Sequence, residues 1–225
     1  MLDLRQIVEE KVILKEKAVN MLEKNNQCFV VGRLSGKFEF HHKGKNCKYY
    51  STTIKIARKN GRIDEIPIIV SKRNAQLDVT KDYTDIKILA IGRYDSICRE
   101  GKLKSGIFAR YVELVGDSVE DENIIYLEGN ICKKPNYRLT PKKHQITDLL
   151  IATNSENGRR SSYIPCLAWK DIAVRAAKYE ASDRIRILGR IESREYTKQN
   201  PENKDKPIKK VSYEVSVFKL DRLEK

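Results

Sequence analysis

The sequence predicts a mainly β protein that contains two copies of one small barrel domain. Four short blocks recur in the same order at an offset of 97 or 98 residues, most of each copy consists of β-rich runs bounded by turn residues, and the two copies carry the same excess of basic side chains. The expected organisation is an amphipathic N-terminal helix (1–24), a first barrel (25–115), an acidic linker (116–122) and a second barrel (123–225).

The duplication is visible in four pairs of matching blocks. They are VVGRL at 30–34 with YLEGNI at 126–131, KNGR at 59–62 with ENGR at 156–159, IPIIVSK at 66–72 with IPCLAWK at 164–170, and GRYDS at 92–96 with GRIES at 189–193. A nearly constant offset over four ordered blocks indicates a tandem repeat. The copies differ at one conspicuous position, because Trp169, the only tryptophan, is matched by Ser71.

The N-terminal segment shows helical periodicity. Its apolar residues fall on one broad face: Leu4, Ile7, Val8, Leu14, Val19 and Leu22. Two interpretations remain open, since this face could pack on the first barrel or form a dimer contact.

Each barrel copy has the element order of an OB-fold, a five-stranded Greek-key barrel. In the second copy the β-rich runs are NIIYLEGNI, HQITDLLIATN, SSYIPCLAW, RIRILGRIESREY and VSYEVSVFKL. A helical stretch at 170–181 lies between the third and fourth runs, and a weaker one is expected at 71–82 in the first copy. Pro67 and Pro165 lie inside the third runs, so each should mark a strand edge or a bulge.

Charge and composition indicate a polyanionic partner. The net charge is +14, with +9 in each barrel copy and −4 in the linker. Two basic domains favour nucleic acid, and a basic surface without a partner is the alternative.

Other features argue against several classes of protein. No apolar run is long enough to span a membrane, and no secretion signal is visible. Five scattered cysteines fit a reduced cytoplasm, here with a nucleoid association. No catalytic motif is visible, and no cofactor is expected. No metal site is expected either, because His41 and His42 near Cys47 lack further ligands.

The second copy resembles the bacterial single-stranded DNA-binding proteins, a family that includes the primosomal replication protein N. The resemblance is carried by LEGNICKKPNYRLTPKKHQITDLLIATN, YIPCLAWKDIA and RIRILGRIESREY, and spans about residues 123–222. In residues 25–115 it depends on the repeat and on the VVGRL and IGRYDS runs.

The resemblance implies that bases stack on Trp169, Tyr163 and Tyr196. A fourth aromatic position of the family falls on Asn157, and the first copy has Ser71, Glu65 and Arg99 at the three stacking positions. The basic residues expected to bind phosphates are Lys133, Lys134, Arg138, Lys142, Lys143, Arg159, Arg160, Arg190, Arg194, Lys198, Lys209, Lys210, Lys43, Lys45 and Arg62. Arg190, Arg194 and Lys198 are expected to follow the fourth strand, and Lys209 and Lys210 to lie in the loop that comes after them.

The expected function is non-enzymatic binding of single-stranded DNA with little sequence preference, in replication, restart, recombination or repair. A homo-oligomer is expected, preferably a homodimer, with replication or recombination proteins as further partners. Two alternatives stay open: a primosome- or mobile-element-type protein-interaction scaffold with degenerate barrels, and an RNA-binding protein.

Overall fold

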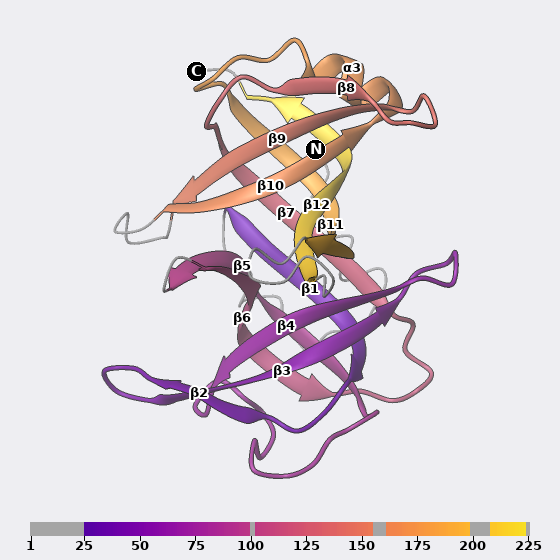
Figure 1. The fold of residues 1–225 in the computed structure, drawn as a ribbon. Coiled ribbons are helices and arrows are strands. Elements are labelled where there is room, and N and C mark those ends of the chain that lie inside the picture. The colour runs from indigo at the N-terminus through magenta and orange to yellow at the C-terminus, as the bar shows by residue number, and fades with distance from the viewer. Residues whose placement is uncertain (1–24, 100–101, 155–160, 199–207, 224–225) are drawn as a thin grey trace.

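The computed structural model describes residues 25–99, 102–154, 161–198 and 208–223. Two β-barrels lie one above the other, and the first strands of both cross between them (Figure 1). The prediction of two tandem OB-folds in a mainly β protein is confirmed. The predicted N-terminal helix lies outside the described residues.

The two halves repeat one order of elements. The first contains β1 (Asn26–Leu34), β2 (Glu39–Lys43), β3 (Lys48–Ala57), β4 (Ile63–Ser71), β5 (Lys87–Arg99) and β6 (Lys102–Leu114). The second contains β7 (Glu122–Ile131), β8 (Asn136–Leu139), β9 (Gln145–Asn154), β10 (Ser161–Trp169), α3 (Lys170–Ala176), β11 (Arg184–Lys198) and β12 (Ile208–Arg222). Each half therefore has one short strand, β2 or β8, that the five-strand prediction did not include. These strands form hairpins with β3 and β9.

The helices differ from the prediction. α3 ends at Ala176, where the backbone continues in turns, and is shorter than the predicted 170–181. The helix predicted at 71–82 is absent, and this segment forms turns instead. The hydroxyl of Thr80 and its backbone N–H both donate to the Asp78 carboxylate, which gives the backbone an alternative to helical hydrogen bonds.

The two barrels are joined by antiparallel pairing of β1 with β7. Near the middle of this ladder Cys28 pairs with Ile125, which is 97 residues later and therefore its equivalent position in the repeat. The ladder thus relates the two copies by an approximate two-fold axis. It also merges both barrels into one twelve-stranded sheet.

The glycine of the first repeat block is required by close strand packing. A Cβ atom at Gly129 would lie 2.2 Å from the Ala152 carbonyl oxygen, and one at Gly32 would lie 2.3 Å from that of Lys55. Strand β7 pairs at this end with both β11 and β9, so the backbones approach too closely for a side chain. The glycines therefore mark the position where each barrel closes.

Replacing Gly129 with alanine is expected to destabilise the fold by about 1–3 kcal/mol, because neighbouring backbone must move. Chemical denaturation followed by circular dichroism measures the change. Gly36→Ala is the matched control, since nothing lies within 4 Å of a Cβ atom there. Equal stability of the two variants would contradict this account.

Candidate nucleic-acid interface

Strand β10 has one buried face and one outward face. Ile164, Cys166 and Ala168 point into the barrel and are buried. Between them lie the outward positions, and β10 pairs with β9 without any shift of register. Alternation is therefore unbroken, and Tyr163 and Trp169 point to the same side of the sheet. Tyr163 is 53% exposed, and Trp169 is half-buried at the end of the strand.

The two strand prolines mark edges rather than bulges. The parallel partner β12 pairs only with Cys166 and Leu167, directly after Pro165. In the same way β6 pairs with β4 from Ile68 onward, directly after Pro67. Each proline thus lies just before the residues that pair with a second neighbouring strand, so its missing N–H removes no hydrogen bond from that second ladder.

The outward face of β10 continues onto β12 and β11. Leu167 lies beside Ser216 in the parallel ladder, and alternation then places Lys210, Ser212 and Glu214 outward on β12. Lys210 is the direct cross-strand partner of Tyr196, which is 42% exposed. The three predicted stacking residues therefore share the outer surface of one sheet.

The fourth and fifth strands extend beyond the barrel as a two-stranded arm. β11 continues to Lys198 and pairs with β12 from Ile208. Arg190, Arg194 and Lys198 consequently lie within β11, and Lys209 and Lys210 lie within β12, which corrects the expectation that they follow the fourth strand or occupy a loop. The long apolar alternation of VSYEVSV maintains this ladder.

The β8–β9 hairpin adds basic residues to one end of this surface. Lys142 and Lys143 lie at its exposed tip, where Lys143 adopts a φ of 61°. The tip is closed by hydrogen bonds from the Thr140 N–H to the His144 carbonyl and from the Lys143 N–H to the Thr140 carbonyl. Arg138 on β8 instead donates two hydrogen bonds to Asp148, at 2.7 and 3.1 Å.

Three carboxylates interrupt this surface, and sequence reasoning missed them. Asp148, Glu192 and Glu214 come from three different strands. Glu214 makes no ion pair with the described residues. The pKa of its carboxyl is raised, chiefly by burial. The charges of Glu192 and Asp148 also raise this pKa, whereas Arg194 and Arg138 lower it. The alternation of Lys210, Ser212 and Glu214 would have indicated that one acid faces outward.

The predicted phosphate-binding residues divide into several groups. Arg138 and Arg190 are already paired with carboxylates, and Arg190 also lies over the Phe218 ring at 5.4 Å. Lys134 approaches Glu180 at 3.8 Å, with both side chains largely exposed. Exposed residues without an ion pair to the described part of the chain are Lys133, Lys142, Lys143, Arg194, Lys209, Lys210, Lys43, Lys45 and Arg62. Arg159, Arg160 and the side chain of Lys198 lie outside the described residues.

The matching positions of the first barrel serve other purposes. Ser71 is buried, and its hydroxyl accepts a hydrogen bond from the Asn74 N–H. The Glu65 N–H donates to the Ser193 hydroxyl of the second barrel at 2.9 Å. The side chain of Arg99 is not described. At the two positions that can be examined, the residues support the fold and the contact between barrels.

A reciprocal contact holds β10 in place. The Ser96 hydroxyl of the first barrel donates to the Tyr163 carbonyl at 3.0 Å, and the Ser162 hydroxyl donates to Asp95 at 2.5 Å. The strand that carries Tyr163 and Trp169 is therefore fixed at its start by the other barrel.

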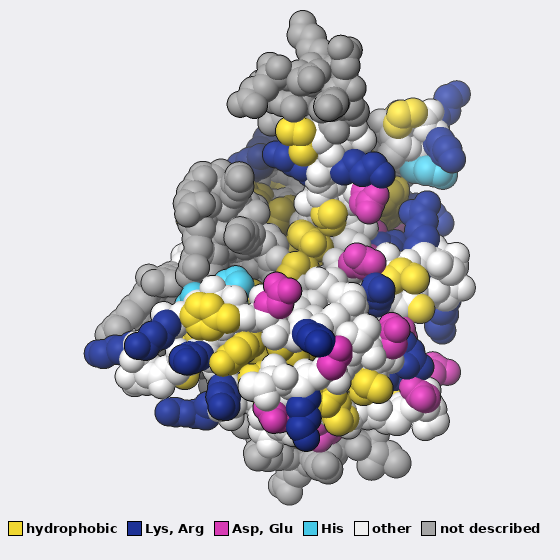
Figure 2. All heavy atoms as spheres, turned by 60° about the horizontal axis from the view of Figure 1, so that its bottom comes forward, with side chains coloured by type: hydrophobic (Ala, Val, Ile, Leu, Met, Phe, Trp, Pro, Cys, Tyr) yellow, Lys and Arg dark blue, Asp and Glu magenta, His cyan; other side chains and the backbone are white. Residues whose placement is uncertain are grey.

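Basic side chains also surround the β2–β3 hairpin of the first barrel, where Lys43, Lys45 and Lys48 are exposed. Figure 2 shows dark-blue side chains along the left edge of this face, beside yellow apolar and cyan histidine side chains. Phe40 is 60% exposed and contacts Tyr50 edge to face. Basic and aromatic residues thus occur together on the first barrel as well.

The described part of the chain contains no helix long and apolar enough to cross a membrane. Within the same residues, no group of three or more histidine, cysteine or acidic side chains is placed to hold a metal ion.

Comparisons with known proteins point to one family. The sequence profile of the single-strand binding protein family matches residues 122–221. Two curated relatives from Thermus thermophilus, both called single-stranded DNA-binding protein, are 27% identical to this chain over 85 residues. The matched segment covers 36% of this chain and 32% of each relative, so it spans about a third of their length.

Solved structures extend the likeness to the whole fold. The wild-type single-stranded DNA binding protein from Thermus aquaticus has a TM-score of 0.69 and 18% identity, covering 89% of this chain and 93% of that one. A deletion mutant of the same protein, which also carries an arginine-to-alanine substitution, has a TM-score of 0.67 and covers 89% and 95%. At this identity the likeness shows the shared fold.

Proposed function

The chain belongs to the single-strand binding protein family through its second barrel, and on that premise we propose that it binds single-stranded DNA with little sequence preference. One observation carries the proposal: Tyr163, Trp169 and Tyr196 share the outer surface of the β10–β12–β11 sheet. Aromatic rings of this kind bind any base, because every base has a flat π-face.

The mechanism combines stacking with phosphate contacts. The rings of Tyr163 and Trp169 face outward from a strand that both barrels hold in place, so they lose little freedom when bases bind. Phosphates on either side contact Lys142 and Lys143 at the hairpin tip, and Arg194 and Lys210 on the arm, in this proposal; the exposure of all four side chains supports it. Arg138 and Arg190 first have to leave their carboxylate partners, so we expect them to contribute less.

The binding is non-enzymatic, and its setting is replication, restart, recombination or repair in the cytoplasm. We propose that the protein acts as a homo-oligomer, with a homodimer presenting four barrels.

Titration with labelled dT oligomers at several salt concentrations tests this function. Quenching of Trp169 fluorescence should accompany binding, and the logarithm of the affinity should fall by about 0.7 per contacted phosphate for each logarithmic unit of salt. The absence of binding and quenching at low salt would contradict the proposal and favour a protein-interaction scaffold. Tighter binding of rU than of dT oligomers would favour RNA.

Glu214 supplies a pH-dependent prediction. Its ionised carboxylate repels phosphates, and its pKa is raised, so binding should tighten as the pH falls from 7 toward about 5. Glu214→Gln should bind about 1.5- to 5-fold more tightly at pH 7, as for the loss of one partly exposed charge, and should show a flatter pH profile. Anisotropy titrations across this pH range measure both effects. Glu120→Gln in the linker is the control with the same charge change, and identical pH profiles for Glu214→Gln and the wild type would refute the prediction.

A further inference from the structure

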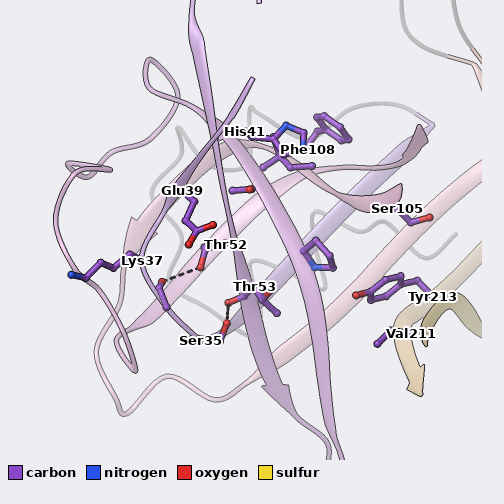
Figure 3. A pocket seen from close by; sticks show the side chains of 14 residues that line it. Ser35, Lys37, Glu39, His41, Thr52, Thr53, Ser105, Phe108, Val211 and Tyr213 are labelled. Atoms are coloured by element: carbon purple, nitrogen blue, oxygen red, sulfur yellow. Dashed lines mark hydrogen bonds between the residues drawn. The ribbon is translucent and has the colours of Figure 1, made fainter. Parts of the chain in front are cut away.

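A cavity of about 560 Å³ opens on the outer surface of the first barrel, and its far wall belongs to the second barrel. In Figure 3, Val211 and Tyr213 enter it from β12, opposite Glu39 and Thr52 of the first barrel. His41 and Phe108 lie together at its top. The cavity is therefore a composite of both repeat copies.

The floor of the cavity is the counterpart of the proposed DNA-binding surface of the second barrel. Pro67 and Ile69 point outward from β4, and they are the repeat mates of Pro165 and Leu167. Ile69 lies beside Phe108 of β6 in the parallel ladder, and Pro67 lies opposite Thr53 of β3. The first barrel thus keeps an apolar surface where its stacking residues are missing.

The cavity wall on the side of the second barrel is formed by the face of the arm that is opposite to the face carrying Tyr196. Side chains alternate along β12, so Val211 and Tyr213 point away from Lys210 and Ser212. One face of the arm carries Tyr196 with Lys210, and the other turns Val211 and Tyr213 toward the first barrel. The Glu65 carboxylate lies near Tyr213, and the Glu65 N–H is bonded to Ser193 of the arm. The arm is therefore anchored where it covers this surface.

The lining suits bases better than phosphates. Its walls are Phe108, Pro67, Ile69, Val211 and the Tyr213 ring. Lys37 also lines the cavity but is paired with Asp82 at 3.4 Å, and Glu39 would repel an anion inside. Hydroxyl groups supply polarity, although those of Ser35 and Thr52 already donate to the carbonyls of Thr53 and Gly36, at 3.1 and 2.9 Å. Lys43, Lys45 and Lys48 are not part of the lining; they are exposed on the β2–β3 hairpin that contributes Glu39 and His41.

We propose that this cavity is a second base-binding site for the strand that the second barrel holds, with bases between Phe108 and Tyr213 and flanking phosphates on Lys43, Lys45 and Lys48. The inference rests on the proposed function and deepens it. A strand that crosses the arm would contact Tyr196 and Lys210 on one face and Tyr213 on the other. The tyrosine that closes the site comes from the opposite repeat copy, so the first barrel binds bases without its own copy of the family's stacking residues.

Two variants test the site. Ser51→Phe fills the cavity from the outward face of β3, and Tyr213→Ala removes its wall. Ser118→Phe, in the exposed linker, adds the same ring away from the cavity. The probes are a dT oligomer of about 10 nucleotides, within the range that one barrel occupies, and one of about 35 nucleotides.

Both cavity variants should bind the long oligomer about 5-fold to 100-fold more weakly than the wild type does, the loss expected for one stacked base, and should bind the short one as the wild type does. Ser118→Phe should match the wild type with both probes. Long-oligomer affinity that is unchanged in a folded Ser51→Phe protein would overturn the proposal, and so would an equal loss for both lengths. Failure of the wild type to bind either oligomer would instead overturn the proposed function, so the two failures are distinguishable.

Discussion

Replacing Trp169 with alanine is expected to weaken binding of a dT oligomer by about 1–3 kcal/mol, the usual contribution of one stacked base. The ring lies at the end of β10, half-buried, on the same outward face as Tyr163. The substitution leaves the buried positions of this strand unchanged, so the fold should be retained. The loss should occur with oligomers of every length, because this position belongs to the principal binding surface.

Fluorescence anisotropy with a labelled oligomer measures this change, and circular dichroism confirms the fold. Phe218→Ala is the matched control, because Phe218 is also an exposed aromatic residue of the second barrel but lies beside Arg190, outside the proposed stacking set. Tyr163→Ala and Tyr196→Ala should give smaller losses than Trp169→Ala. A folded Trp169→Ala protein with wild-type affinity would remove the stacking role from this residue.

Replacing Asn26 with alanine is expected to lower the free energy of unfolding by about 3 kcal/mol. The Asn26 side chain is fully buried; it accepts a hydrogen bond from the Tyr94 N–H at 2.9 Å and donates to the Tyr94 carbonyl at 2.7 Å. It also reaches Thr153 of the second barrel at 3.4 Å. Alanine would leave the two backbone groups of Tyr94 buried without partners, and each such group costs about 1–3 kcal/mol.

Asn123 provides the matched comparison for this second prediction. It is the repeat mate of Asn26 and makes the equivalent pair of bonds with the N–H and carbonyl of Ile191, at 3.0 and 2.7 Å. Asn123 is half-buried, so water can replace its amide, and Asn123→Ala should cost less. Denaturant midpoints of the two variants measure the difference. A larger loss for Asn123→Ala would show that burial does not control the effect.

Much of the architecture follows from local signals in the sequence. The repeated glycines at 32 and 129 mark backbone approaches that leave no room for a Cβ atom, and their constant spacing identified the duplication. The resemblance to the family, rather than alternation, identified Tyr163 and Trp169, because Pro165 left a bulge possible. The structure shows that Pro165 does not interrupt the alternation of β10, so both side chains lie on one face.

The lengths of the two predicted helices were less well determined by the sequence, because local hydrogen bonds and packing on the sheet also affect them. In the first copy, Asp78 binds the N–H and hydroxyl of Thr80, and turns replace the predicted helix. In the second copy, small buried residues at Ala173 and Ala176 let a short helix pack on the sheet, where the Thr147 hydroxyl donates to the Ala173 carbonyl at 2.7 Å.

The sequence by itself determined the duplication and the strand-rich character of both copies, because repeat spacing and strand patterns are local properties, and the element order and the resemblance of the second copy indicated the barrel fold and the aromatic residues. The tertiary structure alone decided which side chains from distant strands meet. It placed Asp148 and Glu214 near each other on the outer surface, and it put Tyr213 of the second copy and Phe108 of the first on the walls of one cavity. These contacts depend on strand register and on the β1–β7 ladder that joins the barrels, and neither follows from the periodicity of any single segment.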